Sequence, residues 1–176
     1  NALVASKFRK LTGGRLRLMG SGGAHLDPKI AKMLYILGYN IIEGYGLTEA
    51  SPLVCSNKLE DIRLGTVGKP LDGVQVKINK QDEILVKGPN VMQGYLHKPE
   101  ETKKTIDADG WLHTGDQGRF NESGDLIITG RIKEMIITSY GKNIAPAFLE
   151  KKISGSRYID QVMVFGDEKR CLVALI

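Results

Sequence analysis

The sequence has few cysteines and no long apolar run. Only two of its 176 residues are cysteine, Cys55 and Cys171. They lie far apart without Cys-x-x-Cys spacing, so we interpret them as reduced packing residues, outside any disulfide framework or metal site. No stretch of about 18 apolar residues predicts a transmembrane segment, and no basic segment followed by an apolar one predicts a signal peptide. These absences favour a cytoplasmic protein and leave peripheral membrane contact open.

The sequence also lacks a basic stripe. Its net charge is +5 and its isoelectric point is near 9.1, a balance that can indicate nucleic-acid binding. The basic residues are scattered, however, and short pairs such as Lys103-Lys104 and Lys151-Lys152 have no interleaved aromatic residues. We therefore expect no nucleic-acid partner, and the modest positive charge also suits small polyanionic ligands.

Residues 16–42 follow a strand–helix–strand pattern. Asp27 and Pro28 are typical of a helix N-cap and a first helical position, and Gly38 is typical of a helix end. Between them, apolar residues recur at helical spacing and predict one apolar helical face: Ile30, Met33, Leu34 and Leu37. With strands expected at 16–19 and 40–42, the pattern indicates an α/β layer.

After Pro52, short apolar segments alternate with turn signals. Strands are expected at 75–78, 83–87, 117–121 and 125–129, with a hairpin turn at Glu122-Ser123-Gly124-Asp125. Beyond Gly130 we expect a strand at 134–138, a turn at 140–143, a helix at 146–153, and strands at 161–165 and 171–176. The predicted fold class is therefore α/β plus a small, mostly antiparallel β unit.

The run from residue 43 to residue 52, Glu-Gly-Tyr-Gly-Leu-Thr-Glu-Ala-Ser-Pro, is the most informative part of the chain. Gly44 and Gly46 flank Tyr45, and glycine lets the backbone approach a flat ligand on both sides of an aromatic ring. The alternative is a core tyrosine beside a tight turn.

Thr48 and Glu49 follow directly. A hydroxyl beside a carboxylate suits a phosphate oxygen and the hard cation that accompanies it. The alternative is a helix start with Thr48 as its cap. Together with the glycines, the pair indicates a nucleotide-phosphate site.

Three blocks of the sequence resemble the adenylate-forming (AMP-binding) superfamily, which includes the acyl-CoA synthetases. Tyr45-Gly46-Leu47-Thr48-Glu49 resembles the family's Tyr-Gly-x-Thr-Glu signature. Trp111-Leu112-His113-Thr114-Gly115-Asp116 resembles its Trp-x-x-Thr-Gly-Asp block, and Gly130-Arg131-Ile132-Lys133-Glu134-Met135-Ile136 resembles its Gly-Arg-x-Lys-Glu-x-Ile block. The run Gly141-Lys142-Asn143-Ile144-Ala145-Pro146 is similar to bacterial long-chain fatty acid–CoA ligases in particular.

The resemblance implies an ATP site. Residues implied to surround the adenine are Gly23, Ala24, Gly44, Tyr45 and Gly46. Thr48 would bind the α-phosphate and the acyl carboxylate, and Glu49 would hold magnesium. For Gly23 and Ala24 the alternative is an ordinary βα turn.

Further positions match the family's ribose, hinge and CoA-binding residues. Asp116 would bind the ribose hydroxyls, since both carboxylate oxygens accept hydrogen bonds, and Arg131 would reach the ribose or the phosphate. Lys133 matches the hinge between domains, and Gly141 a loop lining the path of coenzyme A. The alternative for Asp116 is an ordinary turn aspartate. For Lys133 it is a solvated lysine on a linker, and for Gly141 a simple hairpin turn. We assign no catalytic role to His25.

The resemblance implies three segments and one activity. Residues 1–64 would belong to the large AMP-binding domain, 65–131 to a small β-barrel-like subdomain and 132–176 to the start of the C-terminal α+β domain. The implied enzyme is an ATP-dependent, AMP-forming fatty acid–CoA ligase that uses ATP, Mg²⁺ and coenzyme A. Amino-acid or aryl-acid adenylation, or a nonenzymatic interaction module on the same scaffold, is the alternative.

The sequence also departs from the family pattern. The Ser/Thr/Gly-rich phosphate-binding loop and the C-terminal catalytic lysine have no counterpart here, so we expect an internal fragment that is inactive by itself. Asp82-Glu83 stands where relatives usually have Gly-Glu before a strand.

Overall fold

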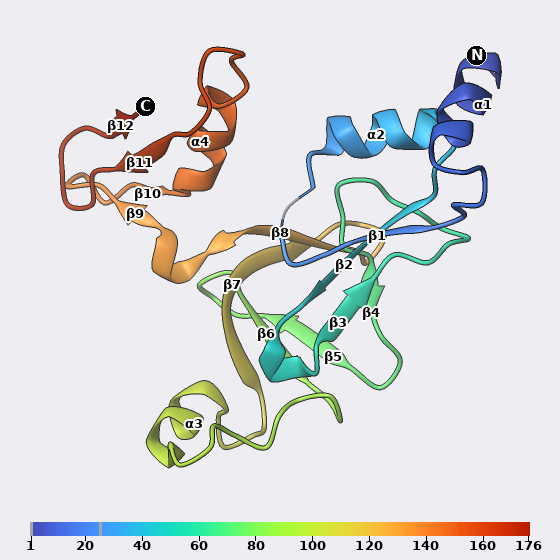
Figure 1. The fold of residues 1–176 in the computed structure, drawn as a ribbon. Coiled ribbons are helices and arrows are strands. Elements are labelled where there is room, and N and C mark those ends of the chain that lie inside the picture. The colour runs from blue at the N-terminus through green and yellow to red at the C-terminus, as the bar shows by residue number, and fades with distance from the viewer. Residues whose placement is uncertain (1, 25) are drawn as a thin grey trace. The chain divides into compact units, whose positions relative to one another are not determined.

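The computed structural model describes residues 2–24 and 26–176, and His25 lies outside the described residues. The chain folds as two compact units (Figure 1). The first comprises the residues up to 114 together with 118–128, and the second comprises 115–117 with 129–176.

The first unit begins with a helix and a mixed sheet. Its elements are α1 (Ala2–Leu11), β1 (Met19–Ser21), α2 (Pro28–Ile36), β2 (Ile41–Gly46), β3 (Leu53–Ser56) and β4 (Lys69–Pro70), and the sheet order is β1-β2-β3-β4. β1 and β2 are parallel, with Met19 opposite Ile41, and β3 is antiparallel to both of its neighbours. The strand–helix–strand prediction is confirmed, although β1 lies three residues later than the predicted 16–19.

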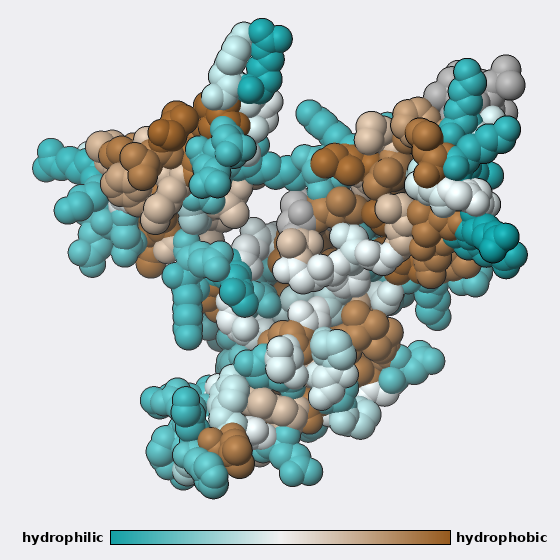
Figure 2. Space-filling model, viewed as in Figure 1, coloured by the Kyte–Doolittle hydropathy of each residue, from teal (hydrophilic) through white to brown (hydrophobic). Residues whose placement is uncertain are grey.

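Helix α2 begins as predicted, and its larger apolar residues are exposed or only partly buried. Asp27 is its N-cap and accepts a hydrogen bond from the backbone N–H of Lys29 at 2.7 Å. The fully buried residue of the helix is Ala31, whereas Ile30 is 48% and Met33 53% exposed. Figure 2 shows apolar side chains gathered on the surface over α2. The predicted apolar residues thus lie on or just after a helix, with Leu34 and Leu37 half-buried and Ile30 and Met33 exposed.

A second, four-stranded sheet lies mainly in the first unit, except for residues 115–117 and 129–131, which belong to the second. Its strands are β5 (Gln75–Ile78), β6 (Glu83–Lys87), β7 (Leu112–Phe120) and β8 (Leu126–Arg131), in that order. The bounds of β5 and β6 are those predicted, and α3 (Pro99–Thr105), which was not predicted, precedes β7. The largest fully buried side chains come from both sheets: Ile84, Leu112, Leu126, Val54, Val86 and Cys55. One hydrophobic core thus joins the two sheets.

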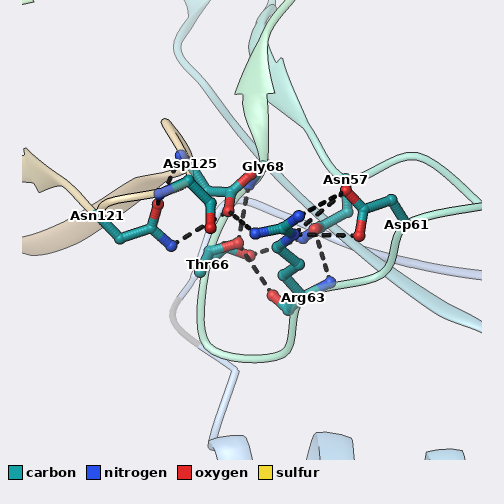
Figure 3. Close-up of polar contacts among 8 residues, drawn as sticks. Asn57, Asp61, Arg63, Thr66, Gly68, Asn121 and Asp125 are labelled. Atoms are coloured by element: carbon teal, nitrogen blue, oxygen red, sulfur yellow. Dashed lines mark hydrogen bonds and ion pairs between the residues drawn. The ribbon is translucent and has the colours of Figure 1, made fainter.

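A polar network also connects the segment after β3 to the β7–β8 turn (Figure 3). Arg63 lies 3.3 Å from the Asp125 carboxylate and 3.1 Å from that of Asp61. The side-chain amide of Asn57 donates to the Thr66 carbonyl at 2.7 Å, and its oxygen accepts the Arg63 N–H at 3.0 Å. Asp125 is only 2% exposed, so Arg63 supplies a charge partner to a buried carboxylate.

The second unit is smaller and buries fewer apolar residues. Its elements are the 3₁₀ turn η2 (Ile132–Glu134), β9 (Ile136–Ile137), β10 (Asn143–Ile144), α4 (Pro146–Ile153), β11 (Met163–Phe165) and β12 (Val173–Leu175). The helix has its predicted bounds, and the strands are shorter than predicted. Ile136 and Val164 are buried, whereas Met163, Phe165 and Leu175 are exposed. Apolar surface over this unit is visible in Figure 2.

Two expectations from composition can be checked directly. Among the described residues, every helix is too short or too polar to cross a lipid bilayer. Both cysteines are free, but only Cys55 is buried. Burial raises the pKa of the Cys55 thiol to about 12. Cys171 is exposed, so interpreting it as a packing residue was wrong.

Candidate functional site

The chain turns sharply at the end of β2, and glycine is required there. A Cβ atom added at Gly46 would lie 1.8 Å from the Pro52 carbonyl oxygen, which accepts the backbone N–H of Leu47 at 2.8 Å. At Gly44 an added Cβ would approach a Leu53 side-chain carbon at 3.1 Å. The close pairing of β2 with β3 therefore accounts for both glycines, independently of any ligand.

Tyr45 lies between these glycines and is only 8% exposed. It belongs to the same buried cluster as Ala50 and Val54. Most of the Tyr45 surface is therefore packed in the core, as the alternative interpretation of the sequence expected. A role beside the adenine stays a proposal.

Thr48 and Glu49 lie on a single 3₁₀ turn, η1 (Thr48–Ala50), directly after β2. The N-cap of this turn is Leu47, so Thr48 is not its cap, and the Thr48 residue is exposed. The turn ends at Ser51 in the left-handed conformation, with φ +50°. Non-glycine residues adopt this region at an energetic cost, and here it reverses the chain into β3.

The Glu49 residue is held by two residues that the sequence analysis did not identify. The Tyr95 hydroxyl donates to Glu49 Oε1 at 2.7 Å, and the Met92 N–H donates to the Glu49 carbonyl at 2.8 Å. The hydrogen bond to this carboxylate is the largest cause of the raised pKa of Tyr95. A Gly-Tyr pair in a polar loop is the one sequence signal that could have indicated Tyr95.

The loop after β1 lies beside β2. Gly23 has φ +76°, a conformation that favours glycine, and a Cβ added at its neighbour Gly22 would lie 3.4 Å from the Gly44 carbonyl oxygen. Ala24 is exposed. Because β1 and β2 are parallel, their carboxyl ends meet at one edge of the sheet, where α/β proteins commonly bind ligands.

In the second unit, Asp116 and Arg131 form an ion pair. Arg131 Nε donates to Asp116 Oδ1 at 2.9 Å, and this bond raises the pKa of the Arg131 guanidinium. Asp116 is 7% exposed, whereas the Arg131 side chain is 62% exposed. The structure therefore brings together Asp116 and Arg131, and Arg131 Nη1 also lies 3.6 Å from the Glu134 carboxylate.

The remaining predicted residues also lie in the second unit. Lys133 is an exposed residue of the turn η2. Gly141 has φ +73° in a tight turn closed by its N–H donating to the Thr138 carbonyl at 2.8 Å. The turn predicted at 140–143 is present but lies earlier in the chain, and Asn143 already belongs to β10. No contact among the described residues tests whether Lys133 is a hinge.

No group of three or more His, Cys, Asp or Glu side chains gathers into a metal site among the described residues. Magnesium does not require one, because it keeps waters and takes substrate phosphate oxygens alongside one or two carboxylates. Glu49 alone is thus compatible with the magnesium prediction.

Comparison with known proteins places this geometry in a family. The family model for the AMP-binding enzyme matches residues 1–96, and that for the AMP-binding enzyme C-terminal domain matches residues 133–176. The chain therefore belongs to the AMP-binding enzyme family.

The relatives are longer than this chain. The long-chain-fatty-acid–CoA ligase FadD15 of Mycobacterium bovis is 42% identical over 99% of this chain, which spans 29% of that ligase. ATP-bound MatB from Rhodopseudomonas palustris is 34% identical with a TM-score of 0.77, over 89% of this chain and 33% of that one. O-succinylbenzoate coenzyme A synthetase (MenE) from Bacillus subtilis, in complex with ATP and magnesium ion, is 27% identical with a TM-score of 0.79, over 96% and 39%.

Proposed function

We propose that this chain is part of a longer ATP-dependent, AMP-forming fatty acid–CoA ligase. In the first step, a carboxylate oxygen of the fatty acid attacks the α-phosphorus of ATP, and pyrophosphate leaves as acyl-AMP forms. In the second step, the thiol of coenzyme A loses its proton, its sulfur attacks the acyl carbonyl carbon, and AMP leaves. The residues contribute mainly positioning and charge stabilisation.

The turn η1 carries the proposal. It presents the exposed Thr48 beside the anchored carboxylate of Glu49 at the end of β2. The Thr48 hydroxyl would donate to an α-phosphate oxygen. The Glu49 carboxylate would hold the magnesium ion. When bound, this ion would supply positive charge that offsets the negative charge of the phosphates. Both residues come from one rigid turn, which favours a fixed distance between the two groups.

The other residues complete the binding of ATP and coenzyme A in this proposal. Asp116 accepts hydrogen bonds from the ribose, Arg131 donates to the ribose or phosphate, and Tyr45 supplies a ring edge to the adenine beside Gly23 and Ala24. Lys133 is the point of rotation between the two steps. Gly141 lies in the loop that coenzyme A passes.

The 176 residues are proposed to be inactive alone. The phosphate-binding loop and terminal lysine of the family are absent from the sequence, and loss of one such charge-stabilising donor typically costs a hundredfold or more. The apolar side chains exposed on α2, such as Ile36 at 63%, support a larger folded context. A cytoplasmic location without a nucleic-acid partner belongs to the same proposal.

The test is acid-dependent ATP–pyrophosphate exchange by the full-length enzyme across a panel of fatty, aryl and amino acids. We expect exchange with long-chain fatty acids, and a roughly hundredfold loss of rate in Thr48→Ala. The exposed Lys80→Ala should retain the parent rate. Absence of exchange with every acid would overturn the proposal.

An aryl acid is the second candidate substrate. The observation that favours it is the structural likeness to MenE, an o-succinylbenzoate coenzyme A synthetase. Its identity of 27% is lower than the 42% shared with the fatty-acid ligase FadD15. Exchange that is faster with aryl than with fatty acids would select it.

A further inference from the structure

The loop between β6 and α3 reaches back to η1 at three points. The side-chain amide of Asn90 donates to the Ala50 carbonyl at 3.1 Å and to the Leu53 carbonyl at 2.9 Å. The Met92 N–H donates to the Glu49 carbonyl at 2.8 Å, and the Tyr95 hydroxyl to the Glu49 carboxylate at 2.7 Å. We call residues 90–95 the strap. The strap binds backbone carbonyls of η1 and, through Tyr95 at the end of the strap, the side chain of Glu49.

The strap is itself anchored at both ends. Where the strap begins, the Val91 N–H donates to the Gly88 carbonyl at 3.1 Å. At the other end, the Tyr95 N–H donates to the Thr102 hydroxyl at 2.9 Å, and that hydroxyl donates to the Lys98 carbonyl at 3.0 Å. Helix α3 thereby fixes the backbone of Tyr95, and the phenol reaches Glu49 from a supported position.

We propose that Tyr95 is a positioning residue that orients the Glu49 carboxylate for the divalent cation bound with ATP. The phenol occupies Oε1, which leaves Oε2 as the oxygen directed to the cation. A glutamate side chain has three rotatable bonds, and its hydrogen bond to a fixed phenol selects one arrangement before the cation binds. Groups that orient a metal-binding carboxylate in this way commonly tune metal affinity.

This inference rests on the proposed function, because it presumes that Glu49 binds the cation. It differs from a purely structural role in one measurable respect. A positioning role changes the Mg²⁺ concentration needed for half-maximal rate while leaving the KM for ATP at saturating Mg²⁺ unchanged. A structural role lowers thermal stability and changes all kinetic parameters together.

The test uses ATP–pyrophosphate exchange by the full-length enzyme, titrated with Mg²⁺ and, separately, with Mn²⁺. Glu49→Gln serves as the reference variant, Tyr95→Phe as the test, and Tyr158→Phe, at a tyrosine that is 80% exposed, as the matched control. We expect Tyr95→Phe to raise the half-maximal Mg²⁺ concentration roughly tenfold, with an unchanged Tm. Tyr158→Phe should behave as the parent.

Each other outcome overturns a defined claim. If Glu49→Gln raises the Mg²⁺ requirement and Tyr95→Phe matches the control, the positioning role is wrong and the proposed function stands. If Glu49→Gln leaves the requirement unchanged, the cation assignment to Glu49 fails and the role of Tyr95 fails with it. A lowered Tm with uniform kinetic losses in Tyr95→Phe would show that Tyr95 acts only in folding.

Discussion

Two hairpin turns of the first unit make the same backbone hydrogen bonds with different residues at the strained position. In the β5–β6 turn the Asp82 N–H donates to the Asn79 carbonyl at 3.1 Å, and in the β7–β8 turn the Gly124 N–H donates to that of Asn121 at 3.0 Å. The fourth residue is left-handed in both, with φ +60° at Asp82 and +79° at Gly124. Each is a turn closed by a left-handed residue, the usual form of a three-residue hairpin loop.

The first residue of each turn explains why an aspartate is tolerated at the strained position. The side-chain oxygen of Asn79 accepts the N–H groups of Gln81 and Glu83 at 2.9 and 3.0 Å. The side-chain oxygen of Asn121 likewise accepts those of residues 123 and 125. These bonds specify the turn whichever residue follows. The departure from Gly-Glu at Asp82-Glu83 therefore does not abolish the turn.

A third turn in the same unit extends the comparison. The Asp107 carboxylate accepts the N–H groups of Asp109 and Trp111 at 3.0 and 2.8 Å, and Gly110 is left-handed with φ +80°. Here a charged side chain takes the place of the asparagine. The three turns thus differ at two positions. The capping residue is asparagine or aspartate, and the left-handed residue is aspartate or glycine.

The largest expected difference in stability is between substitutions of the fifth residue in the two asparagine-capped turns, Asp125 and Glu83. Asp125→Ala removes a buried carboxylate that pairs with Arg63 and accepts from the Asn121 amide at 3.1 Å. We expect a loss of about 2–3 kcal/mol in the free energy of unfolding. Glu83→Ala should cost less, about 1 kcal/mol: Glu83 also accepts from its turn asparagine, Asn79, at 2.9 Å, but its other partner, His113, is partly exposed and water can replace that bond. Urea unfolding followed by the fluorescence of Trp111, the sole tryptophan, measures both. Equal losses would contradict the role of the Arg63 network.

The next difference tests the strained position itself. Gly124→Ala should destabilise the protein by about 1 kcal/mol, because an L-residue is disfavoured in the left-handed region. Among the described atoms none lies within 4 Å of the added Cβ, so backbone strain is the whole effect. Asp82→Gly should stabilise by about 0.5 kcal/mol, the strain relieved less the added chain entropy of glycine. Opposite signs in the same unfolding assay are the expected result, and a destabilising Asp82→Gly would refute the comparison.

These turns also show what the sequence predicts and what it does not. Local signals predicted the β5 and β6 bounds, the Asp27 cap and helix α4, because each depends on residues close in the chain. Helix α3 was missed because its sequence, Pro-Glu-Glu-Thr-Lys-Lys-Thr, has no apolar periodicity. Its side chains make two exposed i,i+3 ion pairs, each worth little, and the Thr102 hydroxyl accepts the Tyr95 N–H and donates to the Lys98 carbonyl.

In the candidate site, too, the sequence predicted some features and not others. Sequence motifs indicated Thr48, Glu49, Asp116 and Arg131, and the structure pairs the last two. The contact between Glu49 and Tyr95 joins residues 46 positions apart, and no local pattern encodes it. The sequence left the burial of Tyr45 open as an alternative, because the choice depends on the core formed by both sheets. Motifs predict which groups carry chemistry, whereas long-range packing decides how they are held.

The smallest expected effect is a dependence on pH of the capping side chain itself, which only the Asp107 turn should have, because asparagine caps the other two turns. The N–H of Trp111 chiefly, and that of Asp109 as well, hold the pKa of the Asp107 carboxyl below its usual value. The ionised form is therefore favoured by folding. Its stabilisation is fully present above the unfolded pKa of about 3.9 and is lost as the pH falls through the lower folded value.

Asp107→Asn should remove this dependence while keeping both hydrogen bonds, because an amide oxygen accepts at either pH and so resembles the turns at Asn79 and Asn121. We expect the difference in free energy of unfolding between parent and Asp107→Asn to stay constant from pH 7 to about pH 5 and to shift toward the variant below about pH 4. His113 and Lys77 also interact with Asp107, so the titration is repeated in 0.5 M salt. A shift that persists in salt comes from the short backbone bonds, since long-range charge effects are screened. A difference that stays constant down to pH 3 would show that the charge of Asp107 contributes nothing to its turn.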